Sequence, residues 1–343
     1  TVFGSIGIPT VTLAKVAEVA PDMLSAYTVL QLAPWFIIVP FLMVAVCGGG
    51  AKAIKGVFPI TLVAGLSFVV PMYFVGRFLG PELTDVIGSI CSLICTIGMG
   101  YAMRNKPIPE EYDMRKNIPA GDKIDTATAV KSWLPFILIF ALLLLTSKLI
   151  PGLYNVLSSI KSNVVFYTGE NPATITFTWI ATPGVMIFIA AIIGGIVQKA
   201  TWGEMGEVFK ATFIQMWPTV ITIVCVLAMA KVMGYSGMIS AIATAIILVT
   251  GSAYPYFAPL FGFIGAFVTG SGISSEVLFG KLQAETAMAI GASPVWLAAS
   301  NSLGAGMGKV ISPQCLAIAS GSVNNPENGE SIMLKKTAPF VIV

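Results

Sequence analysis

Uncharged apolar runs alternate with short charged segments along most of the chain. The first run, residues 23–51, exceeds the ~20 residues that an α-helix needs to cross a bilayer, and Pro34 and Pro40 should bend it. Further runs of this kind predict membrane-spanning helices at residues 56–76, 86–103, 132–150, 171–198 and 211–230. The pattern therefore predicts a protein that crosses a membrane several times.

The segments between these runs differ in character. Residues 104–131 are rich in charge and contain three prolines, so we expect an aqueous loop there. Residues 151–172 are mixed and are expected to lie along the membrane interface, and residues 202–210 to form a short polar turn. Lys and Arg gather in residues 104–131 and in the other segments on the same side of the predicted topology. The positive-inside bias then places the 104–131 loop in the cytoplasm.

Residues 232–275 carry no charge, and this run is too long for one helix. Turn-forming residues at 251–255 should split it. The first half, residues 238–250, is expected to span the membrane. The second half, residues 257–269, is short and is expected to be the descending arm of a re-entrant hairpin, in which two half-helices enter and leave the membrane on one side.

Two breaks interrupt the apolar pattern near the C-terminal end. The first is Gly270-Ser271-Gly272 followed by Ser274-Ser275, and the second extends over residues 301–312. Irregular backbone at membrane depth is tolerated only where it is buried in protein or lines a watery cavity, and it marks the binding sites of transporters. We therefore expect the substrate site at these two breaks.

Two Ser-Pro pairs predict helix starts. Ser293-Pro294 and Ser312-Pro313 each combine a favoured N-cap residue with proline at the first helical position. A half-helix should thus begin at Pro313 at membrane depth. Its free N–H groups and dipole would attract an anion.

Glycines and one lysine accompany the second break. Gly304, Gly306 and Gly308 would let the backbone unwind and approach a ligand, or alternatively would serve tight helix packing. Lys309 adds a positive charge that is expected to bind a substrate carboxylate. The alternative is that its side chain reaches the membrane surface.

At the first break, Ser274 or Ser275 is expected to cap the helix that carries Glu276. Glu276 would lie in the first turn, where the helix dipole favours its anion. It is a candidate for carrying a coupled proton, and the alternative is an ordinary carboxylate at a helix start. The residues expected to bind substrate are Gly270, Ser271, Ser274, Ser275, Asn301, Ser302, Lys309, Ser312 and Gln314.

Composition restricts the classes of function. Of the 343 residues 56% are hydrophobic and 10% charged, against about 25% charged in soluble domains, so we expect an all-α, polytopic membrane protein. The chain has no histidine, and its five cysteines show no disulfide or metal-binding pattern. Without a nucleophile–base or metal-ligand arrangement we expect no catalytic residues and no enzyme. No metal, no cofactor beyond a coupled proton and no nucleic-acid partner are expected.

A faint internal repeat is present. Gly4-Ser5 and Lys15 recur as Gly270-Ser271 and Lys281 at the same spacing, with chance as the alternative. Residues 1–51 would then correspond to residues 270–321, as in transporters with two inverted repeats. The expected regions are the first-repeat hairpin with its following helices at 1–103, the charged loop at 104–131, membrane helices at 132–256, the re-entrant hairpin and broken helix of the substrate site at 257–321, and a loop with the start of a last helix at 322–343.

Several motifs resemble the lactate permease family of bacteria and archaea. They are TGSGISS, LFGKLQ, ASNSLGAGMGKVISPQ and AIAS, together with FGSIGIPT near the start and GPELTD at residues 80–85. The likeness covers the whole chain and is most specific at residues 301–314. Members are longer at both ends, so the chain is expected to be a fragment. The resemblance implies a carrier in the plasma membrane that imports L-lactate, D-lactate and glycolate with protons.

Two departures from the family concern the first break. Well-known members tend to carry TGSDTSSN where this chain has TGSGISSE, so Gly272 replaces an acid and Glu276 replaces an amide. Lys281 and Glu285 add charge to a helix that is usually uncharged. A carrier for another organic anion, such as a dicarboxylate or sugar acid, therefore stays open. A channel fits less well, because half-helices around a midplane site favour alternating access. The oligomeric state is open.

Overall fold

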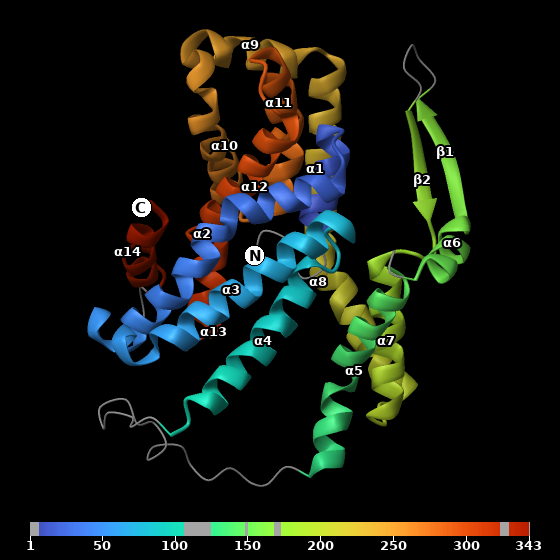
Figure 1. Cartoon of the computed structure of the whole chain (residues 1–343). Helices are drawn as coiled ribbons and strands as arrows, with labels where there is room; N and C mark the ends of the chain where they lie inside the picture. The colour runs from blue at the N-terminus through green and yellow to red at the C-terminus, as the bar shows by residue number, and fades with distance from the viewer. Residues whose placement is uncertain (1–6, 106–124, 148–149, 168–172, 323–328, 343) are drawn as a thin grey trace. The chain divides into compact units, whose positions relative to one another are not determined.

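The computed structural model describes residues 7–105, 125–147, 150–167, 173–322 and 329–342. The chain forms two compact units, Thr1–Lys106 with Pro218–Val343 and Pro107–Trp217. Figure 1 shows the helical course of the chain and a single β-hairpin. The expected all-α architecture is confirmed apart from this hairpin.

The first unit contains most of the helices. They are α1 (Ile8–Ala17), α2 (Pro21–Cys47), α3 (Ile54–Phe78), α4 (Thr84–Ala102), the second part of α8 (Trp202–Tyr235), α9 (Met238–Thr250), α10 (Tyr254–Thr269), α11 (Gly272–Ala289), α12 (Pro294–Val310), α13 (Pro313–Ser322) and α14 (Gly329–Ile342), with short 3₁₀ turns at Ala51–Ala53 and Gly251–Ala253. The split of the long uncharged run between α9 and α10 is confirmed. Helices α2, α3 and α4 cover most of the predicted spans at residues 23–51, 56–76 and 86–103.

Polar and apolar side chains are distributed as in a membrane protein. Large apolar side chains such as Leu248 and Val249 are more than four-fifths exposed, whereas Glu276, Gln283 and Asn301 are buried. Apolar surface of this extent is costly in water but not in lipid. In the described part of the chain, five helical stretches are long and apolar enough to cross a membrane: Pro21–Cys47, Ala51–Phe78, Thr84–Ala102, Thr126–Leu145 and Met238–Thr269.

The second unit corrects two expectations. It contains α5 (Thr126–Leu145), α6 (Pro151–Ser159), the antiparallel strands β1 (Lys161–Tyr167) and β2 (Ala173–Thr178), α7 (Pro183–Val197) and the first part of α8. The predicted span at 171–198 was wrong in its first part, because residues 173–178 pair with β1 and the helix begins only at Pro183. Helix α5 begins inside the predicted charged loop, of which residues 106–124 lie outside the described residues.

The polar turn expected at residues 202–210 is helical and opens α8. Thr201 and Glu204 cap this helix: the carboxylate of Glu204 accepts from the backbone N–H of Thr201 at 2.7 Å and from its hydroxyl at 2.8 Å. These hydrogen bonds lower the pKa of Glu204. The reciprocal contact, from Glu204 N–H to the Thr201 hydroxyl, completes a capping box and explains why the helix starts there.

Helices α10 and α11 form a hairpin that packs against α12, and Figure 1 shows the three side by side. Glycines bring α10 and α12 close together: a Cβ added at Gly304 would meet the backbone of Pro259, and one at Gly308 the backbone of Phe263. Helix α12 continues through both glycines to Val310. The expected unwinding before Lys309 was therefore wrong, and tight helix packing is the reason for Gly304 and Gly308.

The N-terminal helices repeat the pattern of the C-terminal ones. Helices α1 and α11 are each followed by a residue with left-handed backbone, Glu18 or Gly291, and then by a helix with proline at its first position, Pro21 or Pro294. Pro40 and Pro313 stand at equal spacing after these prolines. This supports an internal repeat in a new register. The register suggested by Gly4-Ser5 falls outside the described residues, and the inverted orientation stays a prediction.

Candidate functional site

The two sequence breaks meet in the structure. Gly270 ends α10 with a left-handed backbone (φ 66°), which suits glycine because it lacks a Cβ. A Cβ at this position would lie 2.8 Å from Cβ of Gln314, in the first turn of α13. The tip of the α10–α11 hairpin therefore lies against the start of α13, as expected for a shared site.

Helix α11 begins earlier than expected. Its N-cap is Ser271, whose hydroxyl accepts from the N–H of Ser274 at 3.3 Å, and its first residue is Gly272. The expected caps, Ser274 and Ser275, thus lie inside the helix. Glu276 is consequently in the second turn, where the helix dipole acts on it less than in the first.

Glu276 joins α11 to α12. Its side chain is 1% exposed, and its Oε1 accepts from the hydroxyl of Ser302 at 2.9 Å. Its Oε2 has no hydrogen-bond partner among the described residues. Within those residues Glu276 is the only buried carboxyl group, and the one ion pair joins Arg77 to Asp22 instead. A buried carboxyl group without an ion-pair partner is unfavourable in a protein interior, and it therefore indicates a functional position.

Other buried polar groups on the packed helices α1, α11 and α12 also lack hydrogen-bond partners in the described part of the chain. The side-chain amide of Asn301, the hydroxyl of Ser274 and the hydroxyl of Thr10 on α1 have no hydrogen-bond partner in the described part of the chain. All three residues are almost fully buried, and α1, α11 and α12 pack against one another. Buried polar groups in proteins are nearly always paired, so each of these groups has spare capacity to bind a polar ligand.

Other predicted site residues have structural partners. The hydroxyl of Ser275 donates to the carbonyl of Gly262 at 2.7 Å and ties α11 to α10. Ser312 caps α13, since its hydroxyl accepts from the N–H of Cys315 and donates to the carbonyl of Lys309 at 2.8 Å. Lys309 itself lies half-buried in the last turn of α12. The two Ser-Pro helix starts are confirmed, because Ser293 likewise caps α12.

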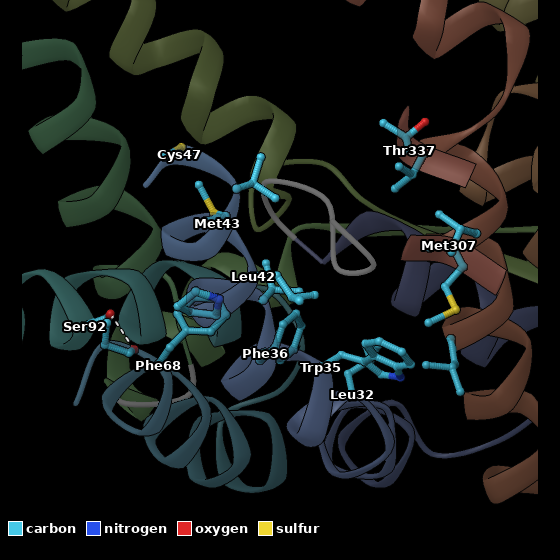
Figure 2. A pocket seen from close by; sticks show the side chains of 18 residues that line it. Leu32, Trp35, Phe36, Leu42, Met43, Cys47, Phe68, Ser92, Met307 and Thr337 are labelled. Atoms are coloured by element: carbon cyan, nitrogen blue, oxygen red, sulfur yellow. Dashed lines mark hydrogen bonds between the residues drawn. The ribbon is translucent and has the colours of Figure 1, made fainter. Parts of the chain in front are cut away.

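A separate pocket of about 730 Å³ lies between α2, α3 and α4 on one side and α12 and α14 on the other. Figure 2 shows apolar side chains such as Trp35, Phe68 and Met307 around it. Ser92 and Thr337 are its hydroxyl-bearing residues, and the hydroxyl of Ser92 donates to the carbonyl of Ala64 at 2.9 Å. A carboxylate in this pocket would lose its hydration without compensation, so the pocket does not suit an organic anion.

Motifs that are distant in sequence also meet around the N-terminal helix. Gly7, in the motif FGSIGIPT, has a left-handed backbone and lies against Pro81, in the motif GPELTD. Gly280, in LFGKLQ, lies against Leu13 of α1. The motifs FGSIGIPT and GPELTD are thus in contact, and LFGKLQ packs against α1, the helix that begins within FGSIGIPT.

Comparison with known families decides the relationship. The family model described as L-lactate permease matches residues 1–343. The chain belongs to the L-lactate permease family. It is 37% identical to the L-lactate permease of Streptococcus iniae over 87% of this chain and 61% of that protein. It is 33% identical to the glycolate permease GlcA of Escherichia coli K12 over 92% of this chain and 62% of that protein.

The L-lactate permease of Bacillus subtilis is 29% identical over 94% of this chain and 63% of that protein. The chain thus spans about three-fifths of the length of the curated relatives that it matches. No solved structure matches the chain.

Two buried polar residues of the first unit were not predicted from sequence. Thr10 is the last residue of the motif FGSIGIPT, but nothing in the neighbouring sequence indicates that its hydroxyl is buried without a partner among the described residues. The buried amide of Gln283 accepts from the hydroxyl of Tyr254 at 2.8 Å and donates to the carbonyl of Ala258 at 2.9 Å, which clamps α11 to α10. The available signal for this clamp was a glutamine with uncharged immediate neighbours on α11.

Proposed function

We propose that this membrane protein is a secondary transporter that imports lactate and related short 2-hydroxy monocarboxylates such as glycolate, with protons as the coupling ion. Membership of the L-lactate permease family and the names of the matched relatives support the substrate class. The observation that most supports the location of the site is the contact between Gly270 and Gln314, which joins the two helix breaks.

The electrostatics of the joined breaks favour an anion. Helices α11 and α13 both begin here, and free N–H groups at helix starts attract negative charge. Lys309 adds a full positive charge one turn before α13. A carboxylate bound here would supply the counter-charge that a half-buried lysine needs.

Glu276 is the proposed carrier of the coupled proton. A carboxyl group takes up and releases one proton, and this one is buried and has an unpaired oxygen. It contacts Ser302 on α12, so its protonation state acts on the packing of the two helices that form the site. The other carboxyl group on α11, Glu285, is only partly buried and accepts from the hydroxyl of Ser240 at 2.6 Å.

The test is uptake of labelled lactate and glycolate by the complete protein in proteoliposomes. A pH gradient, acidic outside, should drive accumulation, and an unlabelled dicarboxylate or sugar acid should not compete. Competition by those acids at equal concentration would instead identify a carrier for another organic anion. Uptake that does not depend on the pH gradient would contradict proton coupling. A protein that takes up neither lactate nor glycolate would contradict the proposed transport function.

The variant Glu276→Gln tests whether Glu276 carries the coupled proton. Glutamine resembles the protonated carboxyl group but cannot release a proton, so gradient-driven accumulation should be lost while lactate–lactate exchange continues. Glu285→Gln, on the same helix, is the control and should accumulate lactate like the parent. If Glu276→Gln still accumulates lactate in response to the gradient, another group carries the proton.

A further inference from the structure

Two buried side-chain amides in the first unit differ in their hydrogen bonding. Gln283 is fully paired, with Tyr254 on its oxygen and the carbonyl of Ala258 on its nitrogen. Asn301 is equally buried, but neither its Oδ1 nor its Nδ2 has a partner among the described residues.

An unpaired amide in a protein interior is unfavourable, because its hydration is lost and nothing replaces it. Packing alone would be served better by an apolar residue of similar size. The amide at residue 301 therefore calls for a functional explanation, and a ligand that completes its hydrogen bonds supplies one.

The position of Asn301 links it to the acid of the candidate site. The next residue, Ser302, donates to Glu276. The backbone of Asn301 lies against Gly262, whose carbonyl accepts from Ser275 on α11. The neighbours of Asn301, Ser302 and Gly262, are therefore hydrogen-bonded to Glu276 and Ser275 of α11, so Asn301 lies where α10, α11 and α12 pack together.

We infer that the Asn301 amide recognises the 2-hydroxyl group of the substrate and sets the preference for 2-hydroxy acids over the same acids without the hydroxyl. This inference rests on the proposed function. An amide presents a donor beside an acceptor, and a hydroxyl group donates and accepts at once, so one hydroxyl satisfies both atoms. A carboxylate only accepts and would leave Oδ1 unpaired.

Hydrogen bonding of this kind gives strong selectivity. A site built to pair with a substrate hydroxyl rejects the analogue that lacks it, because its own polar group then stays buried and unpaired. Propionate differs from lactate, and acetate from glycolate, only in the missing 2-hydroxyl. Each pair isolates the contribution of that group.

The experiment measures binding of the four acids to the complete, purified protein by competition with labelled lactate. The parent should bind lactate at least about tenfold more tightly than propionate, and glycolate more tightly than acetate. Asn301→Leu, which keeps the number and branching of the side chain's heavy atoms but removes its hydrogen bonding, should bring both ratios close to one. Asn301→Ser, which keeps a hydroxyl, should retain part of the preference.

Gln283→Leu is the matched control. Its amide is paired, so the substitution should lower the unfolding temperature and leave both ratios unchanged. Asn301→Leu should unfold at the same temperature as the parent or higher, since it removes an unpaired group. A preference that survives Asn301→Leu, a parent without preference, or an Asn301→Leu protein as destabilised as Gln283→Leu would each overturn the inference. A parent that binds neither lactate nor glycolate would instead contradict the proposed function.

Discussion

At the scale of single residues, Lys309 is the cation expected to hold the substrate carboxylate. It lies on the same face of α12 as Ser302, two helical turns further on, and helical side chains tilt toward the N-terminus, in the direction of Ser302 and Asn301. A hydrogen bond to a charged group contributes about 1.5–3 kcal/mol, so Lys309→Ala should weaken lactate binding about 10- to 150-fold. Equilibrium binding to the purified protein measures this.

Two further variants interpret the result. Lys309→Arg should restore only part of the affinity, because the guanidinium fork differs in shape from an ammonium group. Lys281→Ala removes a half-buried lysine from α11 and should bind lactate like the parent. Binding by Lys309→Ala that equals the parent would mean that Lys309 reaches the membrane surface and takes no part in the site.

The roles of some residues were predictable because the signal lies in neighbouring positions of the sequence. Ser312 and Ser293 were recognised as caps because an N-cap and the proline after it are neighbours in sequence. The contact between Glu276 and Ser302 was not predictable, since it depends on how α11 packs against α12. The cap of α11 was misplaced because Ser271, Ser274 and Ser275 are all suitable residues, and sequence alone does not choose among them.

At the scale of elements, the close approach of α10 and α12 fixes the hairpin of the site. A Cβ at Gly304 would lie 2.6 Å from the carbonyl carbon of Pro259 and 2.9 Å from the nitrogen of Phe263, and these backbone atoms move only if the helices separate. Gly304→Ala should therefore destabilise the protein by about 1–3 kcal/mol, the usual cost of overpacking. A lower unfolding temperature of the purified protein in detergent is the expected result.

Gly56→Ala on α3 is the control, since nothing lies within 4 Å of a Cβ added there. Alanine favours a helix over glycine by about 1 kcal/mol, so this variant should unfold at the parent's temperature or above it. Equal unfolding temperatures for Gly304→Ala and Gly56→Ala would show that α10 and α12 are not in close backbone contact.

The element pattern was predictable where apolar runs and turn residues agree, as at α9 and α10. The prediction was wrong where packing between elements that are distant in sequence decides the structure. The glycines of α12 fit unwinding and close packing equally well, and only the position of α10 decides. Strand β2 reads ATITFT, an alternation typical of a strand, but it merges with the apolar run that continues into α7. Thr201 and Glu204 carried the unused signal of a capping box.

At the scale of the whole molecule, orientation in the membrane follows from charge. The excess of Lys and Arg in residues 104–131 predicts that Asp125, at the start of α5, lies on the cytoplasmic side. Helix α5 is long and apolar enough to span, so Asn163 on β1 should lie on the outer side. Both residues are exposed, which makes them suitable for labelling.

The measurement uses two variants of the complete protein, Asp125→Cys and Asn163→Cys, in which all native cysteines, including the five of this chain, are replaced by alanine. A maleimide that does not cross membranes should label Asn163→Cys in intact cells. It should label Asp125→Cys only after the cells are opened, because one membrane crossing separates the two positions. The reverse result would invert the topology and contradict the charge argument. Labelling of both positions from outside would mean that α5 does not cross the membrane. Uptake of labelled lactate by each variant is the control that the protein is folded.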